Sequence, residues 1–148
     1  MGNSTLPDVH RPAHIVVAED DFEMRRLVSD CLRKEGYEVH EVPDGDQLLV
    51  KVEHSFFLSR TQSPMDLLVT DIRMPVYSGL ALVHGMREAG LAVPVIIMTA
   101  FGNAETRDEA EALGASLLNK PFKMEALRSL VRERLRASHE QEPERRIP

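Results

Sequence analysis

The sequence predicts an α/β fold in which helices cover both faces of one doubly wound sheet of five parallel strands. Two observations predict it: short apolar runs alternate five times with segments of helical period, and the third and fourth runs hold consecutive apolar residues. Each parallel crossover needs a helix and is almost always right-handed, so strict alternation indicates five helices around a single sheet. Consecutive apolar residues are typical of strands that are covered on both faces.

Each predicted strand is a short apolar run, mostly β-branched, that lies between polar or turn-forming residues. The run after Pro94 is the strongest strand signal in the chain. The third run has three adjacent apolar residues near its end, as a doubly covered strand should. In chain order the predicted strands are residues 14–18, 37–42, 65–70, 94–98 and 115–119.

Apolar residues between these strands recur at intervals of three and four, which is the period of a helix. The first such segment ends near Gly36, a typical C-terminal cap. The fourth segment is polar with weak periodicity, which predicts a poorly anchored and mobile helix. In chain order the helical segments are Met24–Leu32, Leu48–Phe56, Leu80–Met86, Ala104–Leu113 and Met124–Leu135.

The domain is expected to comprise residues 14–137. Residues 1–13 are polar, contain proline and show no sustained period, which predicts a flexible N-terminal tail. Residues 138–148 share these properties and are expected to form a C-terminal tail or the start of a linker. The segment Lys51–Pro64 is long, which indicates an extended second helix or loop, and no role is predicted for it.

Composition narrows the class of protein. The chain has 148 residues, 43% of them hydrophobic, and a net charge of -6, which fits one domain with one core and argues against broad nucleic-acid binding. A single cysteine, Cys31, excludes an internal disulfide framework and fits a reducing compartment. No apolar run approaches the roughly 20 residues of a membrane span. We therefore expect a cytoplasmic protein that binds neither membranes nor nucleic acid directly.

Polar side chains stand where the predicted strands end, and ligands of such sheets bind beyond these ends. Glu19 and Asp20 follow the first strand, Asp71 the third, Thr99 the fourth and Lys120 the fifth. Clustered carboxylates repel one another unless a cation lies among them, and hard oxygen ligands favour Mg²⁺. A hydroxyl donor and an ammonium group beside Asp71 would stabilise a phosphoryl group in transfer, with Asp71 as the natural acceptor.

The stretch from His14 to Ala137 resembles a receiver domain of a two-component response regulator, similar to the chemotaxis regulators. The resemblance rests on four segments in the same order along the chain: residues 16–21, 71–75, 99–100 and 120–122. It implies a flavodoxin-like fold with strand order 2-1-3-4-5, for which this family is itself a standard example. It also implies a phosphorylation-dependent switch that receives its phosphoryl group from a sensor histidine kinase.

The resemblance assigns roles to the acidic residues. It implies that Asp71 is the phosphoacceptor and that Glu19 with Asp20 forms the acidic pair. Asp20 and Asp71 would bind Mg²⁺ directly, while Glu19 would act through water. The backbone carbonyl of Arg73 would supply a further ligand.

The resemblance also implies how the phosphoryl group is bound and read. Thr99 would bond a phosphoryl oxygen, Lys120 would pair with it, and Pro121 would fix the chain through a cis bond. Movement of Thr99 and residues 100–103 toward the phosphate would reshape the face formed by the fourth helix, fifth strand and fifth helix. This face is the expected surface for an unnamed downstream protein, and it is also the candidate surface for a homodimer.

The chain departs from the family pattern at Leu117, where a Tyr or Phe usually reports the phosphorylated state. Phe101 could replace that aromatic ring or screen the phosphoryl group from water, which leads to the hypothesis of slow hydrolysis at Asp71.

Two alternative functions stay open. A degenerate receiver would serve as a docking module without phosphorylation; the intact acidic residues argue against it, and the missing aromatic residue keeps it open. A phosphohydrolase with an aspartyl-phosphate intermediate would usually carry a second acid two residues after the nucleophile, where this chain has Arg73. The preferred interpretation is a signalling domain, not an enzyme, that assists its own phosphorylation and dephosphorylation.

Overall fold

The computed structural model describes residues 11–58, 65–100 and 102–141. The strands are β1 (His14–Ala18), β2 (Glu38–Val42), β3 (Leu67–Asp71), β4 (Val95–Thr99) and β5 (Ser116–Asn119). The helices are α1 (Phe22–Lys34), α2 (Gly45–Leu58), α3 (Gly79–Glu88), α4 (Ala104–Ala112) and α5 (Met124–Gln141).

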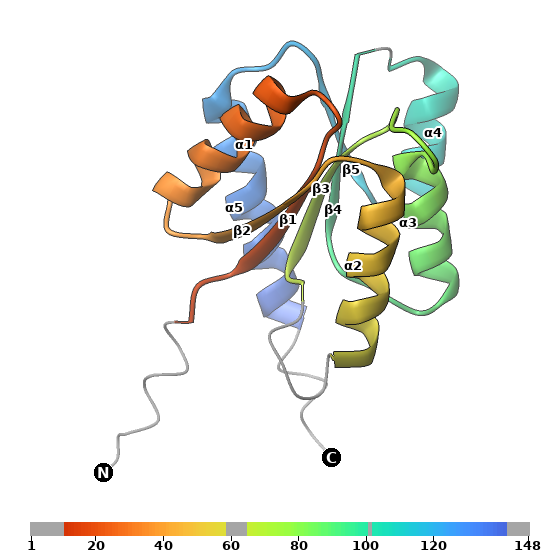
Figure 1. Cartoon of the computed structure of the whole chain (residues 1–148), viewed down its shortest axis with the longest axis horizontal. Coiled ribbons are helices and arrows are strands. Elements are labelled where there is room, and N and C mark those ends of the chain that lie inside the picture. The colour runs from red at the N-terminus through yellow and green to blue at the C-terminus, as the bar shows by residue number, and fades with distance from the viewer. Residues whose placement is uncertain (1–10, 59–64, 101, 142–148) are drawn as a thin grey trace.

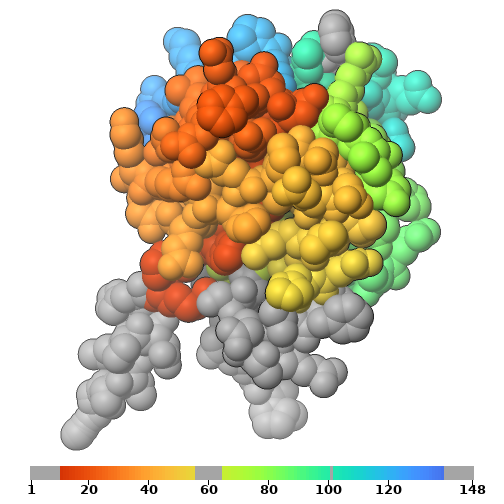
Figure 2. Space-filling model, in the orientation of Figure 1, coloured from red at the N-terminus to blue at the C-terminus, as the bar shows by residue number. Residues whose placement is uncertain are grey.

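The strands form one parallel sheet in the order β2-β1-β3-β4-β5. Helices α1 and α5 cover one face, and α2, α3 and α4 cover the other (Figure 1). Figure 2 shows α1, β2 and α2 across the side of the molecule that is turned to the viewer. The predicted fold class and the strand order that the resemblance implied are both confirmed.

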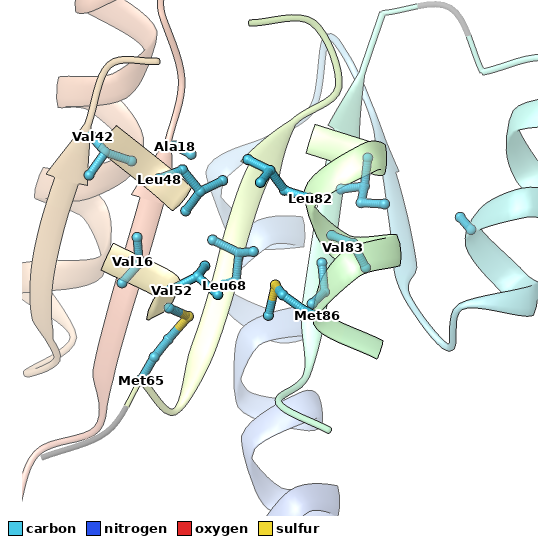
Figure 3. Close-up of a cluster of buried hydrophobic side chains, with 13 residues drawn as sticks. Val16, Ala18, Val42, Leu48, Val52, Met65, Leu68, Leu82, Val83 and Met86 are labelled. Carbon is cyan, nitrogen blue, oxygen red and sulfur yellow. The ribbon is translucent and has the colours of Figure 1, made fainter. Parts of the chain in front are cut away.

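Alternate side chains of the strands supply two hydrophobic clusters, one on each face of the sheet. Val16 of β1 and Leu68 of β3 pack with Val83 of α3 in the cluster under α2 and α3 (Figure 3). Ile15 of β1 packs with Leu127 of α5 in the cluster on the opposite face. This alternation with full burial explains why the strands read as continuous apolar runs.

Two strands, β3 and β4, reach one residue further than the sequence predicts. All strands but β1 start one or two residues later than predicted. Asp71 pairs with Met98 across β3 and β4, and Thr99 pairs with Asn119 across β4 and β5. The ladder therefore includes both residues, which were expected just after the strands. Asp66 precedes β3, and its carboxylate accepts the backbone N–H of His14 at 2.7 Å, which sets where β3 joins β1.

Two helices extend past the ends that the sequence predicts for them. Helix α5 continues to Gln141, four residues past the predicted end of the domain at residue 137. Helix α2 runs to Leu58 and takes up the first part of the long segment 51–64. The remainder of that segment from residue 59, Phe101, residues 1–10 and residues 142–148 lie outside the described residues.

Among the described residues, no helix combines the length and the apolar composition needed to cross a membrane.

Candidate functional site

The carboxyl ends of β1, β3 and β5 bring distant segments together at one edge of the sheet. Carboxylate oxygens of Glu19, Asp20 and Asp71 all lie within 4.8 Å of one another. The ammonium Nζ of Lys120 lies 2.8 Å from Oε1 of Glu19 and 3.5 Å from Oδ2 of Asp71. Four residues predicted from the sequence thus meet in one place, because parallel strands end at the same edge.

Glu19 is the most deeply buried member of this cluster, with 1% of its surface exposed. Lys120 donates to one carboxylate oxygen, and the backbone N–H of Asp21 donates to the other at 3.1 Å. Burial raises the pKa of Glu19 above its ordinary value, and the charge of Asp71 adds to this rise, whereas the bonds from Lys120 and Asp21 oppose it. Because Lys120 and Asp21 each donate to one of them, both carboxylate oxygens of Glu19 already accept a hydrogen bond.

Lys120 supplies a positive charge that the carboxylates of Glu19 and Asp71 stabilise. Burial alone would lower the pKa of its ammonium group, but the hydrogen bond and charge of Glu19, together with Asp71, outweigh burial and raise it. The backbone N–H of Lys120 donates to the carbonyl oxygen of Thr99 at 2.7 Å, which ties the end of β5 to β4. The Lys120–Pro121 peptide bond is cis, as the resemblance implied.

Asp71 is held by the backbone around it. Its Oδ1 accepts the N–H of Ile72 at 2.8 Å, and 9% of its surface is exposed. Helix α3 begins directly against this strand end: a Cβ at Gly79 would collide with the carbonyl oxygen of Asp71. Only glycine allows this close approach. The sequence carried no signal that Gly79 packs against Asp71.

Thr99 and Arg73 are the two remaining predicted site residues. Thr99 is 4% exposed and lies one position beyond Met98, the strand partner of Asp71, so it ends its strand beside the acidic cluster. Arg73 is exposed and follows Asp71 by two residues in the loop before α3. Its backbone carbonyl remains a predicted metal ligand.

The acidic cluster fits a hard metal ion. Three carboxylates meet beside one ammonium group, so an added cation would reduce their mutual repulsion. Asp20 is exposed and Asp71 is nearly buried, which leaves one side of the cluster open to water. Oxygen donors with open positions suit a small divalent cation.

Comparison with known proteins agrees with this geometry. Residues 15–132 match the family model of the response regulator receiver domain. The chain is 33% identical over 125 residues to the two-component response regulator PhoP of Pseudomonas aeruginosa, which covers 84% of this chain and 52% of PhoP. The chain therefore spans about half the length of that relative.

A shorter relative and a solved structure are covered almost completely. Sporulation initiation phosphotransferase F of Bacillus subtilis is 30% identical over 122 residues, which is 82% of this chain and 92% of that protein. The solved receiver domain of the Francisella response regulator 1452 superposes with a TM-score of 0.73 at 26% identity, covering 85% of this chain and 98% of that chain. These matches, together with the acidic cluster and Lys120, show that this chain belongs to the response regulator receiver domain family, which acts in phosphorylation-dependent signalling.

Proposed function

We propose that Asp71 accepts a phosphoryl group from a phosphohistidine of a sensor histidine kinase, and that the phosphorylated chain signals through protein contacts. The observation that best supports this proposal is the convergence of Glu19, Asp20 and Asp71 with the ammonium group of Lys120 at one strand edge. Gathering and burying these charged residues is unfavourable for folding, because like charges repel and burial removes water from them. A cluster that persists despite this cost favours a chemical role.

In the proposed transfer, a carboxylate oxygen of Asp71 forms a bond to phosphorus while the bond from phosphorus to the kinase imidazole nitrogen breaks. The electron pair of the broken bond stays on that nitrogen. Lys120, 3.5 Å from Oδ2 of Asp71, would balance the negative charge of the phosphoryl oxygens. The hydroxyl of Thr99 would donate to one of those oxygens.

Mg²⁺ is the proposed cofactor, and Asp20, Asp71 and the backbone carbonyl of Arg73 are its proposed direct ligands. Glu19 would act through a bound water, because both its oxygens already accept hydrogen bonds. When bound, Mg²⁺ would neutralise part of the charge of the phosphoryl oxygens. In this way the chain would assist its own phosphorylation and dephosphorylation.

The phosphoryl group would add about -1.5 to -2 charges beside Thr99 and Lys120. The proposed output surface is the face of α4, β5 and α5, which would contact a downstream protein or a second copy of the chain. Leu117 of β5 packs against the cluster under α2 and α3, so an aliphatic side chain stands where the family usually has its aromatic reporter.

The expected cytoplasmic location of the protein also remains a prediction.

The test is incubation with Mg²⁺ and acetyl phosphate, followed by intact-mass measurement. We expect a phosphate adduct on the wild type, and at least about a ten-fold smaller yield for Asp71→Asn, because the attacking oxygen is lost. Asp108→Asn, an exposed acid on α4, is the matched control and should react as the wild type does. Chelation of Mg²⁺ should suppress the adduct.

Other outcomes would favour the alternatives. Equal adducts on wild type and Asp71→Asn would contradict Asp71 as acceptor. Steady turnover of phosphate monoesters would favour a phosphohydrolase. No adduct with either acetyl phosphate or a phosphohistidine donor would favour a docking module that is independent of phosphorylation.

A further inference from the structure

A small polar cavity lies at the amino-terminal edge of the sheet, opposite the acidic cluster. Its volume is about 160 Å³. Arg87 from the end of α3, Arg134 and Ser138 from α5, Pro94 before β4 and Gly114 before β5 contribute to its lining. Two helices and the segments that precede two strands thus border a half-open space that the acidic site does not reach.

Arg87 is fixed in place by the backbone around it. Its Nε donates to the carbonyl oxygen of Leu113, and its Nη1 donates to those of Leu91 and Val93, each at 2.8 Å. A guanidinium group has five N–H donors, and these three bonds leave the two donors of Nη2. Within the part of the chain that the structure describes, those two donors have no protein acceptor, and they remain open to solvent.

The positive charge of Arg87 is also not balanced nearby. No carboxylate of the described residues lies within ion-pair distance of it. Burial lowers the pKa of its guanidinium from the ordinary value, but arginine still stays charged near neutral pH. A charge held in a partly buried place without a counter-ion favours an anion beside it.

Arg134 adds a second cation with an unmet donor. Its Nε is buried and has no hydrogen-bond partner. Its ion pair within the described residues is a loose one, 3.9 Å to the adjacent Glu133. None of the described residues that line the cavity is acidic. Two arginines and Ser138 therefore line one small space.

We propose that this cavity binds a phosphate group through Arg87, Arg134 and Ser138. Guanidinium donors match the oxygens of phosphate, and a lining with two cations and no acidic member among the described residues favours an anion. The volume is several times the roughly 30 Å³ share of one liquid water, which leaves room for a tetrahedral oxyanion. The group would come from free inorganic phosphate or from a phosphomonoester.

The test is titration of inorganic phosphate into the ¹⁵N-labelled full chain without Mg²⁺ at constant ionic strength, observed by NMR. We expect saturable shifts of the amides of Gly114 and Ala137, beside the cavity. Arg134→Gln should weaken binding about ten-fold, the loss typical of one charge-assisted hydrogen bond. Arg136→Gln on the same helix makes the same charge change at an exposed residue outside the lining and should bind as the wild type does.

A second variant and a second ligand complete the titration experiment. Ser138→Ala should weaken binding several-fold and removes no charge, so it tests the site even if Arg134→Gln fails to fold. A parallel titration with adenosine monophosphate identifies the source: tighter binding than phosphate indicates a phosphomonoester, and equal or weaker binding indicates free phosphate. The proposal is overturned by an absence of saturable shifts at Gly114 and Ala137, by unchanged affinity in both cavity variants, or by shifts confined to Thr99 and Lys120.

Discussion

On one face of the sheet α1 and α5 pack against the strands and against each other, and on the other face α2 and α3 do the same, whereas α4 makes its main contacts with β5. Helix α5 buries Leu127, Val131 and Leu135. In contrast, the one core residue that α4 provides is Ala110, within the described part of the chain. A cavity of about 330 Å³ with a mostly apolar lining also lies between α2 and α3.

This difference indicates that α5 and α4 have separate tasks. Helix α5 has the burial expected of a stable scaffold, because burial of large apolar side chains dominates stability. Helix α4 can change position at lower cost, since few of its contacts would be lost. The weak anchoring predicted for this helix from its composition agrees with the burial of Ala110 alone, whereas its mobility stays a prediction.

The largest expected effect is on stability when one leucine on each face is shortened. Leu127→Ala on α5 should lower the free energy of unfolding by about 3 kcal/mol, because Leu127 is fully buried and a cavity would remain. Leu113→Ala at the end of α4 should cost about 1 kcal/mol, because Leu113 is only partly buried. Urea unfolding of both variants measures the difference, and equal losses would contradict the comparison.

A smaller effect, of opposite sign, is expected beside the unfilled space between α2 and α3. Gly85 lies inside α3 beside the α2 and α3 cavity, and a Cβ added there would meet nothing within 4 Å. Gly85→Ala should therefore raise the free energy of unfolding by about 0.5 to 1 kcal/mol through helix propensity.

The matched control is Gly90→Ala at the end of the same helix. Gly90 has a φ of +84°, which alanine adopts only with strain, so this variant should lose stability. If Gly85→Ala were also destabilising by chemical denaturation, the space beside α3 would not be open to a side chain.

The smallest expected effect is the sensitivity of the stability to acid through two histidines beside α2. Burial and then Lys51 lower the pKa of His14, and burial, Lys51 and His14 lower that of His40. His40 and Lys51 line a hollow between β2 and α2. Below about pH 6.5 the unfolded chain therefore takes up more protons than the folded one, and stability should fall as pH drops from that value toward the lowered folded pKa values.

Thermal unfolding between about pH 7.5 and about pH 5.5 tests this expectation. The wild type should lose melting temperature across this range, and His40→Gln should lose less, because one of the two groups no longer titrates. An identical fall in both proteins would place the acid sensitivity elsewhere.

Much of the acidic site could be predicted because its residues follow strands. Once the alternation of strands and helices is read as a parallel sheet, Glu19, Asp71 and Lys120 must come to the same edge. The hydrogen bonds that hold the carboxylates of that site in place were not predictable in this way. The N–H groups of Asp21 and Ile72 that hold the carboxylates are backbone donors, and any residue but proline offers one.

The sequence by itself determined the fold class, the edge of the sheet at which the polar residues gather and the weak burial of α4, because these depend on the period and the order of residues along the chain. Only the tertiary structure decided that β3 and β4 include Asp71 and Thr99, that α3 starts against Asp71, and that Arg87 and Arg134 line one cavity. The physical reason is that these features depend on contacts between segments far apart in the chain, and such contacts produce no periodic pattern in the sequence.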